Sequence, residues 1–530
     1  MLNTPRAYGG MVTAPHHLVS QTGAAVLREG GNALEAMFAM AAAIAVVYPH
    51  MNSIGGDSFW LASAPGEEPV GIQACGPAAQ LATPGFYADQ GHSHIPGRGC
   101  LAALTVPGTV GGWQRAFELS RRWGGQMPLP ELLAEAIHHS RNGIAVSASQ
   151  AHLTREKLPE LKAGPGFAET YLDAGRIPPE GFRLRQPALA GTLEHLARAG
   201  LDDFYRGEVA RVLVADLEAA GSPLRLDDLE AYEASFVTPL SVRLTGARAY
   251  NLPPPTQGVS SLALLAILDR LGRPGGEDFA FVHMIVEATK QTFMVRDAEV
   301  RDPASMDVDP ASLLSDEAIA RMAAAIDPAR ALPWPRPSAP GDTVWMGSVD
   351  ANGRAVSFIQ SLYWEFGSGV VSRRTGVLVQ NRGVSFSLAE GHPNRLAPGR
   401  LPFHTLNPAL ARFDDGRTMV YGTMGGEGQP QTQAAVFARY AWSGMALQQA
   451  VTAPRWLLGR TWGSETTTLK LERRWDSGVV TALQLVGHKI ELVEPFSDLM
   501  GHAGAIVRHA DGLLEGAADP RSDGAVAVAL

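Results

Sequence analysis

The sequence has little of the material that several classes of protein require. Its two cysteines, Cys75 and Cys100, are too few for a disulfide framework or a thiolate metal site. Only five of the 44 basic residues are lysine, and none follows a Gly-x-x-x-x-Gly, which excludes a lysine-dependent phosphate loop. The longest aliphatic-rich run, residues 36–47, is far shorter than the about 20 residues of a membrane-spanning helix. The sequence therefore predicts no membrane partner.

Charge and motif searches exclude further classes. The net charge is −9, so nothing indicates a polyanionic partner, and we predict no nucleic-acid binding. The sequence has no His-Glu-x-x-His, no His, Cys and carboxylate set at metal spacing, and no Gly-x-Ser-x-Gly. We predict no metal and no cofactor. The N-terminus lacks an apolar signal region, so the expected location is the cytoplasm.

What is present is an ordinary globular composition, with 45% hydrophobic and 18% charged residues in 530. The run at 36–47 is apolar on every face and predicts a core helix, followed by a Gly-rich loop and a strand at 58–64. Residues 332–341 contain four prolines and predict an exposed, stiff loop. After that loop, the residue patterns are mostly those of β-strands. Further helices are predicted at 132–142, 188–199, 209–219, 260–271, 279–300, 431–442 and 446–452, and strands at 343–349, 355–361, 376–379, 418–422, 468–471 and 488–493, with a final hairpin around Gly512.

The junction of the proline-rich loop with the first of these strands is the most informative place in the chain. Thr343 opens the strand directly after Asp342. An accessible loop precedes it, where a backbone cut is tolerated, and a hairpin turning at Asp350-Ala351-Asn352-Gly353 follows it. A Gly-Gly pair, Gly425 and Gly426, stands after a later strand.

Taken together, these features and motifs along nearly the whole chain resemble the γ-glutamyltranspeptidase family of N-terminal nucleophile hydrolases. Each motif alone is weak, but their order and spacing are specific. The matching motifs are Gly10-Met11-Val12, Gly30-Gly31-Asn32-Ala33, Pro49-His50 through Ile54-Gly55-Gly56, Val106-Pro107-Gly108-Thr109-Val110, Pro254-Pro255-Thr256-Gln257-Gly258, Gly367-Ser368-Gly369 with Gly376, Gly425-Gly426, Gly516-Ala517 and Asp519-Pro520-Arg521-Ser522-Asp523.

The resemblance implies an α+β fold, a four-layer αββα sandwich built from two autoproteolytic chains. Self-cleavage between Asp342 and Thr343 would give a helix-rich large chain, 1–342, and a small chain, 343–530, intertwined in one fold. Thr343 would then act as the nucleophile, with its freed α-amine as general base. The N–H groups of Gly425 and Gly426 would hold the oxyanion, and Ser361 matches the hydroxyl that hydrogen-bonds the nucleophile. The two chains would be each other's partners, and a homodimer is left open.

Several γ-glutamyl recognition positions depart from the family pattern. No arginine lies between Arg28 and Arg98, where the family supplies its carboxylate clamp. The positions that hold the substrate amine are Tyr363 and Ser385, and the serine pair before the Gly-Gly is His404-Thr405. A buried ammonium without an acceptor costs several kcal/mol, so these residues do not favour glutathione.

The departures point to a particular branch of the family. The runs 380–383, 391–394 and 425–431 resemble the γ-glutamyltransferase-like proteins and oxamate amidohydrolases. A small acid amide needs an anion clamp, which Arg382, His404 and Thr405 could supply, with Gln429 and Gln431 also lining the pocket.

The sequence therefore predicts a threonine amidohydrolase that cleaves a small carboxylated amide, with oxamate the leading candidate. One alternative is a γ-glutamyl hydrolase or transferase that acts on glutathione or related amides through other binding residues. A second is an unprocessed, inactive scaffold that only binds a ligand.

Overall fold

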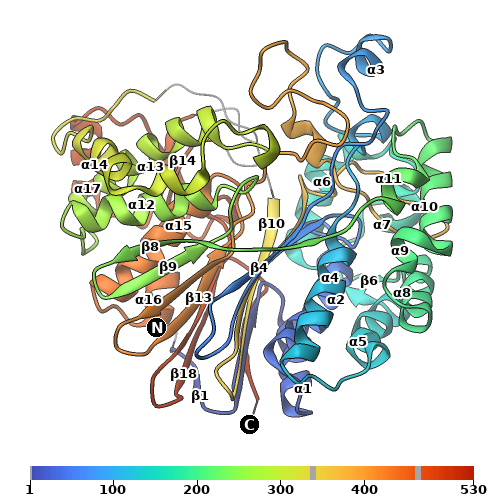
Figure 1. The fold of residues 1–530 in the computed structure, drawn as a ribbon, viewed down its shortest axis with the longest axis horizontal. Coiled ribbons are helices and arrows are strands. Elements are labelled where there is room, and N and C mark those ends of the chain that lie inside the picture. The colour runs from blue at the N-terminus through green and yellow to red at the C-terminus, as the bar shows by residue number, and fades with distance from the viewer. Residues whose placement is uncertain (1–2, 335–341, 460–466, 530) are drawn as a thin grey trace.

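Two antiparallel sheets stacked face to face, each covered on its outer side by helices, form the molecule (Figure 1). The structure is a computed structural model that describes residues 3–334, 342–459 and 467–529. In the view of Figure 1, one helical layer lies to the right of the sheets and the other to the left. The order of layers is thus helix, sheet, sheet, helix, the predicted αββα arrangement.

Each sheet has seven strands and mixes segments from both sides of residue 342. The first has the order β19-β2-β10-β11-β3-β4-β7 and the second β1-β18-β17-β13-β12-β9-β8. The bounds of the first are β19 Ala525–Val528, β2 Gly10–Ala14, β10 Asp342–Asp350, β11 Ala355–Tyr363, β3 Asp57–Ser63, β4 Val70–Ala74 and β7 Ser235–Val237. Those of the second are β1 Arg6–Ala7, β18 Leu514–Ala518, β17 Ala503–Arg508, β13 Thr418–Thr423, β12 Ala409–Phe413, β9 Ala247–Asn251 and β8 Leu240–Leu244. Small sheets join β14 Trp456–Leu458, β15 Leu469–Glu472 and β16 Ile490–Val493, and β5 Ile144–Ala145 with β6 Arg183–Leu184.

The helices fall into two groups, one on each outer face. On the first sheet lie α1 His17–Arg28, α2 Ala33–Val47 and α4 Thr109–Arg122, backed by α5 Leu129–Asn142, α8 Pro187–Ala199, α9 Asp203–Arg206, α10 Glu208–Ala219 and α11 Leu226–Glu230. On the second lie α12 Gly258–Arg270, α15 Gly428–Phe437 and α16 Leu447–Thr452, backed by α13 Phe279–Glu299, α14 Asp316–Ala324 and α17 Ser477–Leu485. The remaining helices are α3 Pro84–Ala88, α6 Ala148–Leu161 and α7 Phe167–Tyr171. Short turns of helix comprise η1 Cys100–Ala102, η2 Pro303–Ser305, η3 Pro310–Leu314, η4 Arg382–Ser385, η5 Ala438–Trp442 and η6 Asp498–Met500.

Three hydrophobic cores follow from this layering. One lies under each helical layer, and the third lies between the sheets, where Phe59, Trp345, Ile359, Val420 and Ile506 meet. Side chains alternate between the faces of a strand, so every second residue of β10 and β11 points between the sheets and the others point toward α2. Both faces of these central strands are buried, because each is packed against another layer.

Helix α2 has the apolar composition that its position requires. All of its residues are buried, which agrees with the predicted core helix at 36–47. It begins earlier than predicted because Asn32 caps it. The Asn32 side chain accepts hydrogen bonds from the backbone N–H groups of Leu34 and Glu35, and the Glu35 carboxylate accepts one from the Asn32 N–H. No helix within the described ranges is long and apolar enough to cross a membrane.

Most of the other predicted elements appear within a few residues of their expected bounds. The strand predicted at 376–379 is wrong: this segment makes only isolated bridges, from Val379 to Gly55 and from Leu378 to Val371. The helix predicted at 431–442 begins earlier, at Gly428, and its last part, Ala438–Trp442, widens to a π-helix. Of the proline-rich loop at 332–341, residues 335–341 lie outside the described residues.

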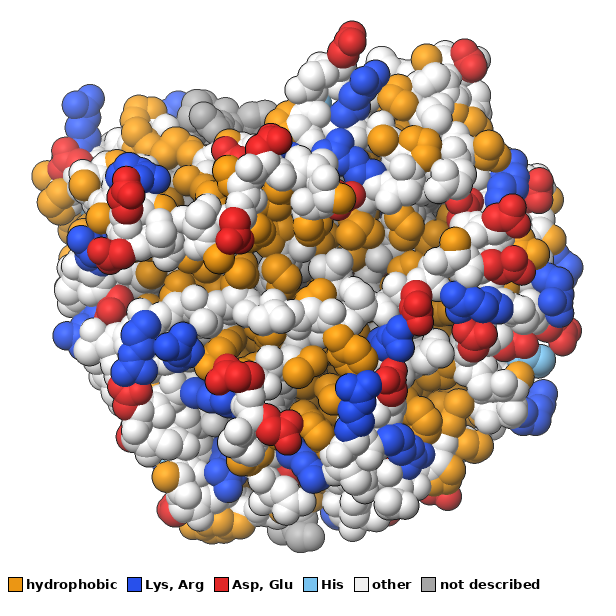
Figure 2. Space-filling model, in the orientation of Figure 1, with side chains coloured by type: hydrophobic (Ala, Val, Ile, Leu, Met, Phe, Trp, Pro, Cys, Tyr) orange, Lys and Arg blue, Asp and Glu red, His pale blue; other side chains and the backbone are white. Residues whose placement is uncertain are grey.

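The face of the molecule drawn in Figure 2 carries side chains of both charges. On the face drawn in Figure 2, acidic and basic side chains are interspersed across the surface. Many of them form pairs there, such as Arg243 with Asp414. Surface pairs of this kind contribute little to stability.

Candidate active site

Thr343 lies at an irregularity in the central hairpin. In the pairing of β10 with β11, Asp342 lies opposite Tyr363 and Val344 opposite Gln360, so the register shifts at Thr343. A bulge of this kind re-aims a side chain and is common next to active sites. The Thr343 side chain is buried, and its hydroxyl donates to Ser361 Oγ at 3.3 Å.

Ser361 and Tyr363 end the neighbouring strand β11. Ser361 follows Ile359 at the two-residue spacing that keeps side chains on the face between the sheets. Its Oγ also accepts a hydrogen bond from the Tyr363 N–H at 2.8 Å. Tyr363 has φ +82°, a left-handed conformation that is strained for a residue with a bulky side chain. This conformation stands at the last residue of β11, two residues after Ser361, which accepts the hydrogen bond from the Thr343 hydroxyl.

Arg382 lies against the ring of Tyr363. Its guanidinium carbon is 3.8 Å from the ring centroid, and the side chain is 1% exposed. Neither terminal nitrogen has a hydrogen-bond partner among the described residues. Burial lowers the pKa of Arg382 to about 10, partly offset by Tyr363 and Asp57, so the group stays charged at neutral pH. A buried guanidinium with unpaired donors fits an anion.

His404 and Thr405 lie beside the segment at Pro255 and Gln257. The His404 N–H donates to the Pro255 carbonyl at 2.8 Å, and the Gln257 N–H donates to the His404 carbonyl at 2.9 Å. The backbone is thus fixed, while neither ring nitrogen of His404 nor the Thr405 hydroxyl has a hydrogen-bond partner in the described ranges. Burial and the charge of Arg382 hold the pKa of His404 well below its usual value, so the ring is neutral.

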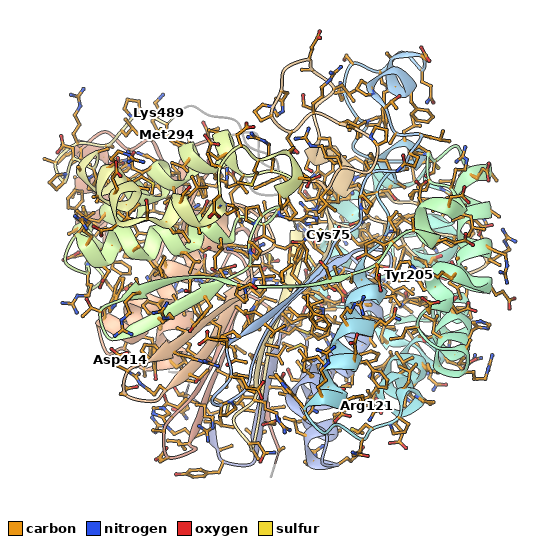
Figure 3. The ribbon with its side chains drawn as sticks, in the orientation of Figure 1. Cys75, Arg121, Tyr205, Met294, Asp414 and Lys489 are labelled. Carbon is orange, nitrogen blue, oxygen red and sulfur yellow. The ribbon has the colours of Figure 1, made fainter. Side chains whose placement is uncertain are left out.

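Asp57 is a site residue that sequence reasoning missed. It begins β3, is 1% exposed, and its Oδ2 lies 3.5 Å from His404 Nε2. Its Oδ1 accepts from the N–H groups of Gly76 and Gly108 and from the Gln380 side chain. The available signal was an acidic residue placed directly after Ile54-Gly55-Gly56 at the start of a strand with no polar face. Cys75, whose pKa burial and Asp57 raise, lies in the centre of the molecule in Figure 3.

Gly425 and Gly426 form the turn between β13 and α15. Their φ angles are +113° and +54°, which favour glycine at both positions. Both residues are buried, and neither N–H donates a hydrogen bond to the described part of the chain. Buried backbone N–H groups are almost always paired, so two unpaired donors in one turn indicate a place for an acceptor.

Gln257 ties this turn to Thr405. Its side-chain amide donates to the carbonyl oxygens of Thr405, at 2.7 Å, and Gly426, at 2.9 Å. Arg296 donates to the Gln257 side-chain oxygen and to Glu427, which fixes the orientation of the amide. Gln257 therefore holds the Gly-Gly turn and the Thr405 segment together.

The other predicted pocket residues, Gln429, Gln431 and Ser385, differ in their hydrogen bonding. Gln429 is fully buried in the first turn of α15, and neither atom of its amide has a hydrogen-bond partner among residues that the structure describes. Gln431 bonds to the backbone of Glu427 and Leu458. These bonds fix its side-chain amide, and the expectation that Gln431 lines the pocket stays a prediction. Ser385 is half-buried, and its carbonyl accepts from Asn394.

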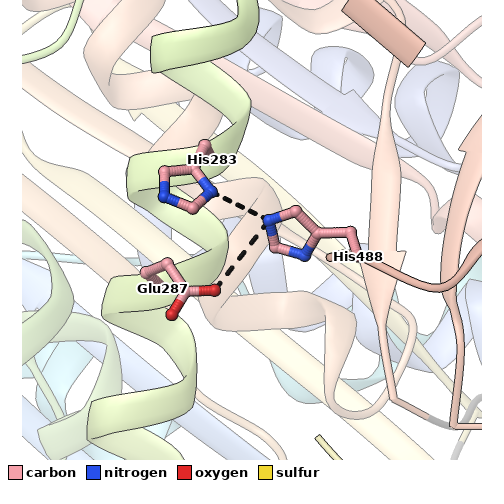
Figure 4. A group of neighbouring side chains, drawn as sticks. All are labelled: His283, Glu287 and His488. Carbon is pink, nitrogen blue, oxygen red and sulfur yellow. Dashed lines mark hydrogen bonds and ion pairs between the residues drawn. The ribbon is translucent and has the colours of Figure 1, made fainter. Parts of the chain in front are cut away.

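A group with metal-ligand chemistry does exist, away from this site. Figure 4 shows His283 and Glu287 of α13 beside His488, with His283 Nδ1 2.9 Å from His488 Nε2. The search for metal-ligand spacings in the sequence missed this group because His488 is far from His283 and Glu287 in the sequence. Lys290 Nζ lies 2.6 Å from Glu287 Oε1, so the carboxylate already has a cation. His283 Nε2 is 3.0 Å from the Asp327 carbonyl, which can only accept, so this nitrogen carries the proton. The arrangement favours a hydrogen-bonded network that ties residues 327–332 to α13.

Comparison with known proteins places this architecture in a family. The Gamma-glutamyltranspeptidase family model matches residues 19–529. The chain belongs to this family. It is 56% identical over 519 residues to an oxamate amidohydrolase proenzyme of Klebsiella pneumoniae subsp. pneumoniae, covering 98% of each chain. It is 40% identical over 518 residues to the glutathione hydrolase-like YwrD proenzyme of Bacillus subtilis, covering 97% of each.

The fold is shared with a solved structure over the same length. A crystal structure of cephalosporin acylase from Bacillus halodurans is similar with a TM-score of 0.91 and 32% identity, covering 100% of this chain and 97% of that one. The predicted family and the α+β sandwich fold are therefore confirmed. The chain is an amidohydrolase of the gamma-glutamyltranspeptidase family.

Proposed function

We propose that this chain is an autoprocessing threonine hydrolase that cleaves the amide of a small carboxylated substrate, with oxamate the leading candidate. The observation that carries the proposal is the buried Arg382, whose terminal nitrogens have no hydrogen-bond partner in the described chain. Its guanidinium stacks on Tyr363, which ends β11 opposite Asp342 in the hairpin that carries Thr343. The relative at 56% identity is named an oxamate amidohydrolase proenzyme, which agrees with this choice.

Maturation is the first step. The Thr343 hydroxyl attacks the Asp342 carbonyl carbon, and the acyl group moves from the Thr343 nitrogen to its oxygen. Water then hydrolyses the ester, which releases chain 1–342 with a terminal carboxylate and leaves chain 343–530 with a free α-amine. The register shift at Thr343 supports this step, because an irregularity of this kind re-aims a side chain and is common next to active sites. The names of both curated relatives, which contain the word proenzyme, support it too.

The same hydroxyl then attacks the substrate. The α-amine, whose usual pKa is about 7.7–8.0, takes the Thr343 hydroxyl proton as the oxygen bonds to the amide carbon. The unpaired N–H groups of Gly425 and Gly426 would stabilise the oxyanion. Ammonia leaves with the proton from the α-ammonium, and water attacks the acyl-enzyme to release the dicarboxylate. Ser361 orients the nucleophile through the bond at 3.3 Å.

Substrate selection depends on charge. Arg382 supplies a fork of donors for one carboxylate, and its charge acts on neutral His404. The side-chain polar atoms of His404, Thr405 and Gln429 lack partners within the described part of the chain. Glutathione carries an α-ammonium as well as carboxylates, and Tyr363, which burial keeps neutral with a pKa of about 12, offers it no negative charge. Oxamate needs no such acceptor, so it is favoured over γ-glutamyl amides.

A comparison of oxamate with glutathione tests the proposal. We expect kcat/KM for oxamate, measured as ammonia release, to exceed that for glutathione by at least about 10²-fold, equivalent to about 2.8 kcal/mol. Comparable efficiency on the two substrates would instead support the γ-glutamyl hydrolase alternative.

Maturation is tested on the same preparations by a denaturing gel. Thr343→Ala should remain a single 530-residue chain, whereas Thr343→Ser should still split because it keeps a hydroxyl. An Ala variant that still splits between Asp342 and Thr343 would refute self-cleavage by this residue, and a wild-type chain that never splits would support the inactive scaffold.

A further inference from the structure

Asp57 is a buried carboxyl of the site to which the proposed reaction gives no role. Three donors, from Gly76, Gly108 and Gln380, hold its Oδ1 at 3.0–3.3 Å. Its Oδ2 accepts no hydrogen bond from the described residues and faces His404 Nε2 at 3.5 Å. One oxygen is thus fixed in place, while the other is directed into the cluster of unpaired polar groups.

Among the described groups that interact with Asp57, Arg382 is the cation that balances its charge. His404 before β12 lies 3.5 Å from Asp57 Oδ2, and Arg382 of η4, the Cys75 thiol after β4 and the Tyr205 and Tyr232 hydroxyls interact electrostatically with Asp57. His404 is neutral because its pKa is lowered well below the usual value, and burial raises the pKa of the thiol and of both hydroxyls well above theirs. Arg382 is therefore the only charged group in this set at neutral pH that opposes Asp57.

Arg382 and Asp57 balance each other without contact. The terminal nitrogens of Arg382 bond to none of the described residues, Asp57 included. Both side chains are 1% exposed, so solvent screens their attraction weakly. The guanidinium donors therefore remain available for an incoming carboxylate, which would bring a second negative charge against a single positive one.

We propose that Asp57 is the resident counter-charge of Arg382, and that it takes up a proton when a carboxylate substrate binds to the guanidinium. The proton, drawn from solvent, would bind at Oδ2, the oxygen that has no donor. Asp57 acts through Arg382 and is a positioning residue, not a catalytic one. This inference rests on the proposed function, since it takes Arg382 as the anion clamp.

The consequence is a defined pH dependence of substrate affinity. Burial raises the pKa of Asp57 to about 7, and Arg382 partly opposes the shift. Below this pH Asp57 is mostly neutral, and Arg382 receives the substrate carboxylate without competition. Above it Asp57 is ionised and must be protonated for tight binding, so KM rises with pH. For a site at about 7 the rise reaches about 30-fold between pH 6 and 8.5 if only the protonated form binds.

Kinetics of the matured enzyme on oxamate between pH 6 and 8.5 test the proposal. We expect at least a tenfold rise of KM in the wild type and a change of less than threefold in Asp57→Asn. Asparagine keeps the acceptor for the three donors but cannot titrate. The α-amine of Thr343 titrates in both enzymes, so it affects kcat alike and cancels in the comparison.

A matched control comes from the opposite end of β10. Asp350 is also a buried aspartate whose pKa burial raises, and its carboxylate bonds to the backbone N–H groups of Ala33, Asn352 and Arg354. Asp350→Asn should keep the wild-type rise of KM. A flat profile in the wild type, or an unchanged rise in Asp57→Asn, would overturn the proposal.

A binding experiment separates this proposal from the proposed function. Isothermal titration of oxalate, the dicarboxylate product that has no amide to cleave, at pH 7.5 in imidazole and in Tris, which differ in ionisation enthalpy, counts the protons taken up on binding. Uptake by the wild type that is lost in Asp57→Asn would support the role of Asp57 even if oxamate were not hydrolysed. Absence of binding, or equal uptake by both proteins, would refute it. If Asp57→Asn does not mature, Asp57→Ser takes its place in both experiments.

Discussion

Replacing Arg382 with methionine should weaken substrate binding and leave the fold intact. In the proposed complex the guanidinium donates two charge-assisted hydrogen bonds to the substrate carboxylate, each worth about 1.5–3 kcal/mol. Losing both therefore costs about 3–5 kcal/mol once partial compensation by neighbouring donors is allowed. That cost corresponds to a rise in KM for oxamate of about 10²–10⁴-fold. The kcat value should fall much less, because Arg382 binds a part of the substrate that does not react.

The stability of this variant gives a second, independent signature. Methionine removes a buried cation without hydrogen-bond partners in the described ranges, and it loses the stacking on Tyr363, worth about 1–2 kcal/mol. These effects oppose each other, so at pH 6, where Asp57 is mostly neutral, the free energy of unfolding should not fall by more than about 1 kcal/mol. Removing a buried arginine whose guanidinium is hydrogen-bonded within the protein would lower the free energy of unfolding by more than this. Urea unfolding of the matured protein measures it.

Two further variants complete the test. Arg382→Lys keeps the charge but not the planar fork, and should give an intermediate KM. Arg374→Met is the control, because Arg374 precedes Arg382 in the chain and lies on the surface, where its side chain pairs with Asp216. Steady-state kinetics on oxamate compare all four proteins. A KM for Arg382→Met within threefold of the wild type would show that another group binds the carboxylate.

The remaining predictions concern the Gly-Gly turn and the histidine network. Gly426→Val should lower kcat by about 10²–10³-fold, because a β-branched residue at φ +54° displaces the proposed oxyanion donor; circular dichroism should show an intact fold, and an unchanged kcat would move the oxyanion site elsewhere. His488 should make the protein less stable in acid. Burial and the charge of Lys290 lower its folded-state pKa to about 3, so its contribution is complete above the unfolded pKa near 6.5 and is lost as the pH falls toward 3, by at most about 1.4 kcal/mol per pH unit. Urea midpoints between pH 4.5 and 7.5 should fall less steeply for His488→Gln than for the wild type, and identical slopes would contradict this assignment.

The residue types and their local order in the sequence are sufficient to predict much of the secondary structure of this protein, and its family. The apolar run at 36–47 can only be a buried helix, and the strands flanking Asp350-Ala351-Asn352-Gly353 form the expected hairpin. The ordered motifs were sufficient to predict the family and, through it, the fold. These features are local in the sequence or follow a fixed order along the chain, so they can be recognised from the sequence alone.

Tertiary structure decided the composition of the site. Asp57 and His404 are far apart in sequence, and only the pairing of β3 with β11 and the path of the chain past Pro255 bring them together. The same applies to His283 and His488, which no spacing rule connects. Gln429 and Gln431 differ in hydrogen bonding. The Gln431 amide has backbone groups within hydrogen-bonding distance, whereas the Gln429 amide has no partner among the described residues. Such facts depend on long-range packing, which sets burial and partners, and burial in turn sets the charge of each group.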